Sequence, residues 1–312
     1  MKLYIVIPCY NEQEVLPEAS SRLKQKITEL IEKKEISKDS RIVFVDDGSK
    51  DRTWEIISDL HEQDPMFSGI KLSCNKGHQN ALLAGLTEVA DLADAVISMD
   101  ADLQDDINAV DGFINKYNKG CDVVYGVRSS RQKDTFFKRF TAEGFYKFMS
   151  FLGADIVFNH ADYRLLSSRA LKGLLEFREV NLFLRGIVPM IGYKSDIVMY
   201  ERAERFAGES KYPLKKMLSF AFDGITSLSI KPIRLIFSLG MGIFAVSIIA
   251  LIYCLVRYLT NNTISGWTSL IMSIWLLSGL QLMAIGVIGE YIGKVYLETK
   301  GRPKFIVEEF LN

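Results

Sequence analysis

Short apolar runs rich in β-branched residues alternate with longer amphipathic stretches through the first two thirds of the chain. Between the early runs, Glu14–Lys33 and Thr53–Gln63 repeat apolar positions at helical spacing. Strands alternating with helices at this spacing predict an α/β fold with a mostly parallel sheet and helices on both faces. The predicted strands are Leu3–Ile7, Arg41–Val45, Gly69–Leu72, Ala95–Met99, Asp122–Tyr125 and Asp196–Tyr200.

Two longer apolar runs follow, at about 235–256 and 268–289, and from Leu235 to Gly289 the only charged residue is Arg257. Each run reaches the ~20 residues that a helix needs to cross a bilayer. The alternative is a helical hairpin buried in a soluble core. Basic residues flank the pair on its outer sides, which predicts a multi-pass protein of the inner or plasma membrane with both termini cytoplasmic. These residues are Lys231, Arg234, Lys294, Lys300, Arg302 and Lys304.

Two amphipathic segments combine an aromatic or aliphatic face with basic residues, at Phe136–Leu152 and Pro213–Lys231. Such helices lie in the headgroup region of a bilayer, or they pack on the catalytic core. We therefore expect an α/β domain at 1–210, an interfacial helix at 211–232, and a membrane domain with a cytoplasmic tail at 233–312.

The 312-residue chain has 38 basic and 38 acidic residues, so its formal net charge is zero. A protein that tracks nucleic-acid phosphates needs a basic excess, and we expect no nucleic-acid partner. The four cysteines form no pair at metal-ligand spacing, which favours free thiols in a reducing compartment.

Polar residues follow nearly every predicted strand, where ligands bind in open α/β sheets. Asp46 and Asp47 end the second strand, followed by Gly48. Their carboxylates are suited to accept hydrogen bonds from a nucleotide base or a ribose hydroxyl. An acidic turn that only caps the next helix explains the same pattern.

The segment Asp100–Asp105 is a stronger signal, because Asp100 and Asp102 form an Asp-x-Asp motif directly after an apolar run. Mg²⁺ or Mn²⁺ is typically held by one or two carboxylates and substrate phosphates, and it neutralises a leaving diphosphate. The alternative is a solvated acidic loop. Farther along, Asp162 is a candidate general base, but Arg164 two residues later suggests a salt bridge as readily. His160 competes for the role of base.

Two basic groups complete the pattern, Arg128 with Arg131 and a later group that includes Arg205 and Lys211. Arginine captures phosphate in a bidentate manner, and near a bilayer it also attracts anionic lipid headgroups.

Taken in order, these segments resemble the family-two inverting glycosyltransferases with a GT-A fold, and within them the dolichyl-phosphate-mannose-synthase group. The nearest pattern is that of bacterial polyprenyl-phosphate glycosyltransferases with two C-terminal spans. The resemblance covers essentially the whole chain. It runs through Pro8–Glu12, Val45–Ser49, Asn75–Gln79, Asp100–Asp105, Asp162–Arg164 and Arg205–Lys211. One departure is Asp106, where many relatives carry proline, and we expect a changed loop there.

The resemblance implies a role for each matched position. The nucleotide-sugar would contact Pro8, Tyr10, Glu12, Asp46, Asp47, Lys76, Gly77 and Asp100. The metal would be held by Asp100, Asp102 and Gln104, with Asp102 and Asp162 as the catalytic residues. The donor or acceptor phosphates would meet Arg128, Arg131, Arg164, Arg205 and Lys211.

The implied reaction is transfer of a hexose to polyprenyl phosphate, in bacteria undecaprenyl phosphate, with inversion. UDP-glucose is the first expectation for the donor, UDP-N-acetylglucosamine the second and GDP-mannose the third. A processive polysaccharide synthase is disfavoured, because its Gln-x-x-Arg-Trp motif and extra spans are missing from the sequence. A non-enzymatic membrane scaffold is disfavoured by the intact acidic residues. Relatives suggest a homo-oligomer, specifically a tetramer.

Overall fold

The computed structural model describes residues 1–129, 160–179, 183–201 and 266–312, with scattered positions between 233 and 256. These residues fall into two units, a sheet-containing unit that includes residues 302–312 and a helical unit that includes the last long helix. The amphipathic segments predicted at 136–152 and 213–231 lie outside the described residues.

The sheet-containing unit is built on eight strands in the order β7-β5-β6-β4-β1-β2-β3-β8. The pairs β1–β2, β1–β4, β2–β3 and β5–β7 are parallel, and the pairs involving β6 or β8 are antiparallel. The strands are β1 (Leu3–Cys9), β2 (Arg41–Asp46), β3 (Phe67–Leu72), β4 (Ala95–Ser98), β5 (Val123–Arg128), β6 (His160–Ser167), β7 (Ser195–Tyr200) and β8 (Val307–Leu311). All six predicted strands are present, and the α/β fold class is confirmed.

Helices cover both faces of the sheet because both faces of its strands are apolar. In β1, Leu3, Ile5 and Ile7 belong to one buried cluster, whereas Tyr4 and Val6 belong to another. This is the alternation that a strand imposes when it is buried on two sides. The first face is covered by α1 (Leu16–Glu32), α2 (Thr53–Gln63) and α4 (Ala109–Asn118), and the second by α3 (His78–Val89), α6 (Ser168–Leu175) and α7 (Leu184–Met190).

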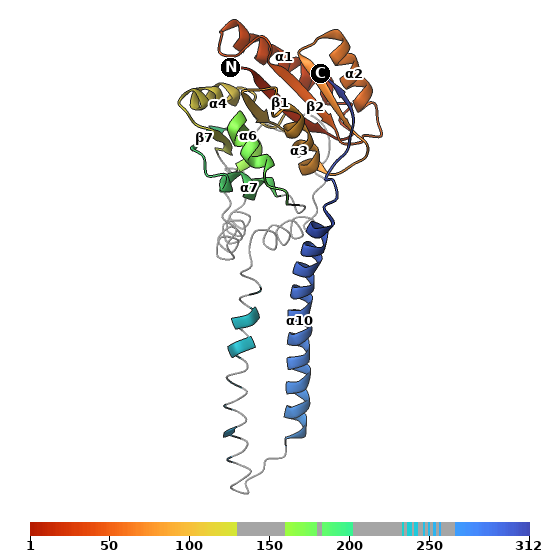
Figure 1. Ribbon diagram of the computed structural model, residues 1–312, viewed down its shortest axis with the longest axis vertical. Coiled ribbons are helices and arrows are strands. Elements are labelled where there is room, and N and C mark those ends of the chain that lie inside the picture. The colour runs from red at the N-terminus through yellow and green to blue at the C-terminus, as the bar shows by residue number, and fades with distance from the viewer. Residues whose placement is uncertain are drawn as a thin grey trace. The chain divides into compact units, whose positions relative to one another are not determined.

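The strands that the sequence analysis did not predict are β6 and β8. β6 lies between β4 and β5, and its side chains from Asp162 to Ser167 are buried. β8 pairs antiparallel with β3, so the end of the chain extends the sheet beside the N-terminal strands (Figure 1). The cytoplasmic location expected for residues 302–312 stays a prediction; in the structure their strand covers an edge that β3 would otherwise expose.

The helical unit contains α10 (Trp267–Lys300), 34 residues without a break. Its segment Leu277–Lys300 is long and apolar enough to cross a membrane, and it is the one such helix among the described residues. It includes much of the predicted span 268–289. Most of the predicted span 235–256 lies outside the described residues. Among its scattered described positions, Phe237, Met241 and Ile249 are helical and exposed.

Candidate active site at the carboxyl ends of the strands

The loops that follow β1 and β2 are joined by reciprocal hydrogen bonds. The N–H of Asn11 donates to Ser49 Oγ at 2.9 Å, and the N–H of Lys50 donates to Asn11 Oδ1 at 2.8 Å. The N–H of Glu12 donates to Thr53 Oγ1 at 2.9 Å. These bonds fix the loop that carries the predicted nucleotide residues Pro8, Tyr10 and Glu12. Tyr10 is 39% exposed, and its contact with a nucleotide stays a prediction.

Asp46 and Asp47 are buried at the end of β2. Asp47 accepts the N–H groups of Lys76 at 2.7 Å and Gly77 at 2.9 Å, one on each oxygen. Burial raises the pKa of both carboxyls, and the backbone N–H groups partly offset that rise. Asp47 therefore holds the loop after β3 in place. Direct contact of Asp46 or Asp47 with a nucleotide stays a prediction.

Gly48 makes this close approach of two loops possible. Its φ is +64°, and an added Cβ would lie 2.7 Å from the carbonyl carbon of Cys74 and 2.7 Å from the nitrogen of Asn75. Only glycine combines that backbone conformation with that space.

Asp100 follows β4, and its Oδ1 is buried without a hydrogen-bond partner in the described part of the chain. Burial raises the pKa of this carboxyl to about 6; His78 lowers it, and Asp162 raises it further. Asp102 Oδ1 accepts the N–H of Gln104 at 3.1 Å across Leu103, whose φ of +56° is costly for a residue with a side chain. A strained turn thus follows the Asp-x-Asp motif, and Oδ1 of its first residue, Asp100, accepts no hydrogen bond among the described residues.

The Asp100 carboxylate fits a hard cation, because its buried Oδ1 accepts no hydrogen bond among the described residues, and His78 Nε2 lies 3.4 Å away without the geometry of one. No group of three His, Cys, Asp or Glu side chains placed for a metal ion occurs among the residues the structure describes. A site with Asp100, Asp102 and Gln104 therefore depends on substrate phosphates for further ligands, which is the usual arrangement for Mg²⁺.

Asp162 lies beside Asp100, because β4 and β6 pair antiparallel with Ser98 opposite Arg164. Its carboxylate accepts an N–H from the buried Arg164, and it also binds Arg185 of α7, with Nε–Oδ1 at 3.3 Å and Nη2–Oδ2 at 3.0 Å. Burial by itself would raise the pKa of Asp162, but Arg185 and Arg164 together hold it well below its usual range. A carboxylate held in this way is a weak base.

His78, the first residue of α3, lies between the two acids. Its Nε2 is 3.4 Å from Asp100 Oδ1 and 3.7 Å from Asp162 Oδ2. His78 falls within the matched segment Asn75–Gln79, but no role is predicted for it, whereas His160 is the histidine predicted to compete as a base. Arg185 was missed altogether, because nothing near it in the sequence marks it as part of this site.

Arg164 and Arg128 are the two predicted phosphate-binding residues that the structure describes. Arg164 is 1% exposed and also donates to the carbonyl of Leu184 at 3.3 Å. Arg128 lies with its Nη2 3.7 Å from Asp105 Oδ1, and Asp105 accepts the hydroxyl of Tyr200 at 2.6 Å. Phosphate binding by either arginine stays a prediction. Arg131, Arg205 and Lys211 lie outside the described residues.

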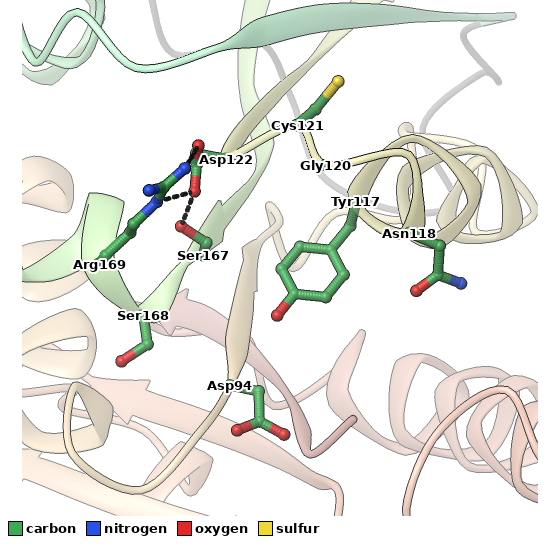
Figure 2. Close-up of a pocket in the computed structure, with 9 residues that line it drawn as sticks. All are labelled: Asp94, Tyr117, Asn118, Gly120, Cys121, Asp122, Ser167, Ser168 and Arg169. Carbon is green, nitrogen blue, oxygen red and sulfur yellow. Dashed lines mark hydrogen bonds and ion pairs between the residues drawn. The ribbon is translucent and has the colours of Figure 1, made fainter.

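A cavity of about 500 Å³ lies at the other end of the sheet, where β4 and β5 begin. It is lined by Asp94, Tyr117, Asn118, Gly120, Cys121, Asp122, Ser167, Ser168 and Arg169 (Figure 2). Asp122 is already bound by Arg169, with Nε–Oδ1 and Nη2–Oδ2 both at 2.5 Å, and by Ser167 at 2.9 Å. None of the predicted site residues lines this cavity.

Similarity to known proteins extends over both the sheet-containing part and the apolar C-terminal part of this chain. The chain is 56% identical over 306 residues to the glycosyltransferase YkoT of Bacillus subtilis (strain 168), covering 98% of this chain and 91% of that protein. It is 39% identical over 310 residues to the prophage bactoprenol glucosyl transferase homolog of Escherichia coli (strain K12), covering 99% of each. It is also 39% identical over 311 residues to the bactoprenol glucosyl transferase of Shigella phage SfII, covering 99% of this chain and 98% of that one.

The family model described as glycosyl transferase family 2 matches residues 4–175, which include strands β1–β6 and the acidic residues at their ends. The predicted GT-A fold and the assignment as a transferase are thereby confirmed. This chain is a glycosyltransferase and belongs to glycosyl transferase family 2.

Proposed function

We propose that this glycosyltransferase transfers a hexose from a nucleotide-sugar to polyprenyl phosphate at the cytoplasmic face of a membrane. Glucose from UDP-glucose is the first choice, and the lipid is undecaprenyl phosphate. The observation that carries the proposal is the 39% identity to bactoprenol glucosyl transferases, because it extends over 99% of the chain. It therefore includes the apolar helix as well as the catalytic sheet.

The acidic residues after β4 support metal-assisted transfer. The ion would be Mg²⁺ or Mn²⁺, with Asp100, Asp102 and Gln104 as its protein ligands. When bound, such an ion neutralises the charge that develops on a leaving diphosphate. The feature of the site that supports this role is the buried Oδ1 of Asp100, which accepts no hydrogen bond from the residues that the structure describes.

The acceptor needs little help to become a nucleophile. A phosphate monoester has a second pKa near 6, so its oxygen is already largely anionic at pH 7. A single displacement by this oxygen at the anomeric carbon inverts the configuration there, and the nucleoside diphosphate leaves. Positioning and charge neutralisation then lower most of the barrier.

Asp162 supports the same reading of the chemistry. Its two arginine partners keep it ionised but make it a weak base. We infer that it orients basic side chains rather than removing a proton from the acceptor.

The C-terminal helix supports a location at the membrane, because Leu277–Lys300 is apolar and none of its apolar window is buried by the residues that the structure describes. We propose a multi-pass protein of the inner membrane with both termini cytoplasmic. Oligomerisation, with a tetramer as the form suggested by resemblance, belongs to the same proposal.

The test uses the full chain in membranes, supplied in turn with radiolabelled UDP-glucose, UDP-N-acetylglucosamine and GDP-mannose, with Mg²⁺ or Mn²⁺. Organic extraction separates a labelled lipid from a polymer. We expect labelled undecaprenyl-phosphate-glucose, released by mild acid, and none from the double variant Asp100→Ala with Asp102→Ala. Label from GDP-mannose would select the mannosyltransferase alternative, and label in an insoluble polymer would reject transfer to a lipid. An unaffected double variant would reject the metal site.

A further inference from the structure

The carboxylate of Asp162 is bound by two arginines that differ in their access to solvent. Arg164 has a side chain that is 2% exposed, and Asp162 has one that is 8% exposed. The side chain of Arg185 is 40% exposed. A buried guanidinium needs a carboxylate close by, and Asp162 meets that need for Arg164. Arg164 and Asp162 compensate each other's charge, and Arg185 adds a second, half-exposed guanidinium at the same carboxylate.

The orientation of Arg185 is fixed from both sides. Its Nε and Nη2 approach the two oxygens of Asp162 side by side, at 3.3 Å and 3.0 Å. This two-point contact sets the plane of the guanidinium. The preceding residue, Leu184, is held through its N–H by Gln79 Oε1 at 3.3 Å and through its carbonyl by Arg164 Nη1 at 3.3 Å. Arg185 is therefore a preorganised cation and not a freely rotating surface side chain.

Arg185 also lies next to the residues that the proposed donor would meet. Asp162 is linked through His78 to Asp100, with distances of 3.7 Å and 3.4 Å from Nε2. His78 and Gln79 begin α3, directly after the loop that Asp47 holds. The half-exposed guanidinium is thus linked to Asp100 of the Asp-x-Asp motif through Asp162 and His78.

We propose that Arg185 binds a phosphoryl group of a substrate, in an orientation set by the buried Arg164–Asp162 pair. Guanidinium groups hold phosphate through charge-assisted hydrogen bonds of defined direction. The phosphoryl group belongs either to the nucleotide diphosphate of the donor or to the lipid phosphate of the acceptor. This inference rests on the proposed function.

The experiment compares wild type with Arg185→Gln and Arg185→Lys, as full-length protein in nanodiscs, and measures kcat and KM separately for UDP-glucose and undecaprenyl phosphate. Loss of a charged hydrogen bond predicts a KM that rises roughly ten- to a hundredfold for one substrate in Arg185→Gln. The other KM stays within about twofold, and Arg185→Lys recovers part of the loss because it keeps the charge. A rise for UDP-glucose assigns the diphosphate, and a rise for the lipid assigns the lipid phosphate. If both KM values stay at wild type while kcat or Tm falls, Arg185 is only structural.

The control is Arg169→Gln, which removes the same kind of two-point contact with a buried aspartate, Asp122, at the opposite end of the sheet. Its KM values should equal those of wild type. A further variant joins Arg185→Gln with Asp162→Asn. If Arg185 merely neutralised Asp162, removing that charge would restore activity, and this outcome would overturn the proposal. If Arg185 binds a phosphoryl group, the double variant should be as impaired in activity as Arg185→Gln.

The failure of the inference is distinguishable from failure of the proposed function. Wild-type protein that forms no glycosylated lipid from any donor rejects the function. Wild-type protein that forms it, alongside an Arg185→Gln variant with unchanged KM values, keeps the function and rejects the role of Arg185.

Discussion

Replacement of Asp162 by asparagine tests whether this carboxylate organises the site or acts as a base. The change keeps the size of the side chain and one oxygen acceptor, but it removes the charge that Arg164 and Arg185 share. Arg164 is then a buried cation without a counterion. Arg185 loses the carboxylate that fixes its direction.

The expected loss of stability follows from the exposure of each partner. Breaking a buried ion pair by removing one partner costs about 3–5 kcal/mol, and Arg164 and Asp162 are both buried. Asparagine retains an acceptor for Arg164, which reduces the loss, and the half-exposed Arg185 adds less than about 1 kcal/mol. We expect a total of about 2–4 kcal/mol. For a domain of this size that lowers Tm by roughly 5–15 °C.

The assay pairs thermal unfolding of the full chain in nanodiscs with transfer rates at saturating substrates and pH 8, where the acceptor phosphate is a dianion. An essential general base contributes about 10²–10⁴ in rate. We expect Asp162→Asn to retain its rate within about tenfold while its Tm falls. Asp196→Asn is the control, because Asp196 pairs with Lys116 on the surface and such pairs contribute about 0–1 kcal/mol.

Two outcomes would refute this reasoning. An unchanged Tm would show that Arg164 does not depend on Asp162 for its charge balance. A rate loss above a hundredfold with normal Tm and normal KM values would restore Asp162 to the role of base.

Three further predictions concern other parts of the sheet. Gly48→Ala adds a Cβ 2.7 Å from backbone atoms of the loop after β3, so we expect a raised KM for the nucleotide-sugar in addition to a lower Tm. Gly120→Ala is the control, because Gly120 also has a positive φ, +81°, but an added Cβ would have its nearest atom at 4.0 Å. This control variant should lower only Tm. Arg169 and Ser167 lower the pKa of Asp122, so this contact stabilises the fold above the unfolded pKa of about 3.9 and is lost as the pH falls through the lower folded value. Arg169→Gln should therefore reduce Tm at pH 7, and the Tm difference from wild type should disappear in acid. A Tm difference that does not change with pH would show that the Arg169–Asp122 ion pair does not stabilise the fold. Deletion of residues 307–312 removes β8 and exposes the edge of β3, so light scattering should detect aggregation that the intact chain does not show.

The sequence by itself determined the elements whose pattern is local. Apolar β-branched runs identified six strands, and helical spacing identified α1 and α2 within a few residues. Since parallel strands bring their carboxyl ends to one edge, the same pattern indicated that Asp46, Asp47, Asp100 and Asp102 belong to one site. The apolar composition of 268–289 likewise predicted a long membrane-type helix, although α10 continues to Lys300.

Only the tertiary structure decided the elements and contacts that depend on distant partners. β6 has the mixed sequence His160–Ser167, and it is a strand because β4 and β5 pair with it on both sides and Asp162 compensates the buried charge of Arg164. β8 forms because β3 offers an open edge more than two hundred positions earlier, as the pairing of Gly69 with Leu311 shows. Neither the place of His78 between two acids nor the contact of Arg185 with Asp162 leaves a signal in the sequence. Each depends on how helices pack across the sheet, and packing of that kind is a property of the whole fold.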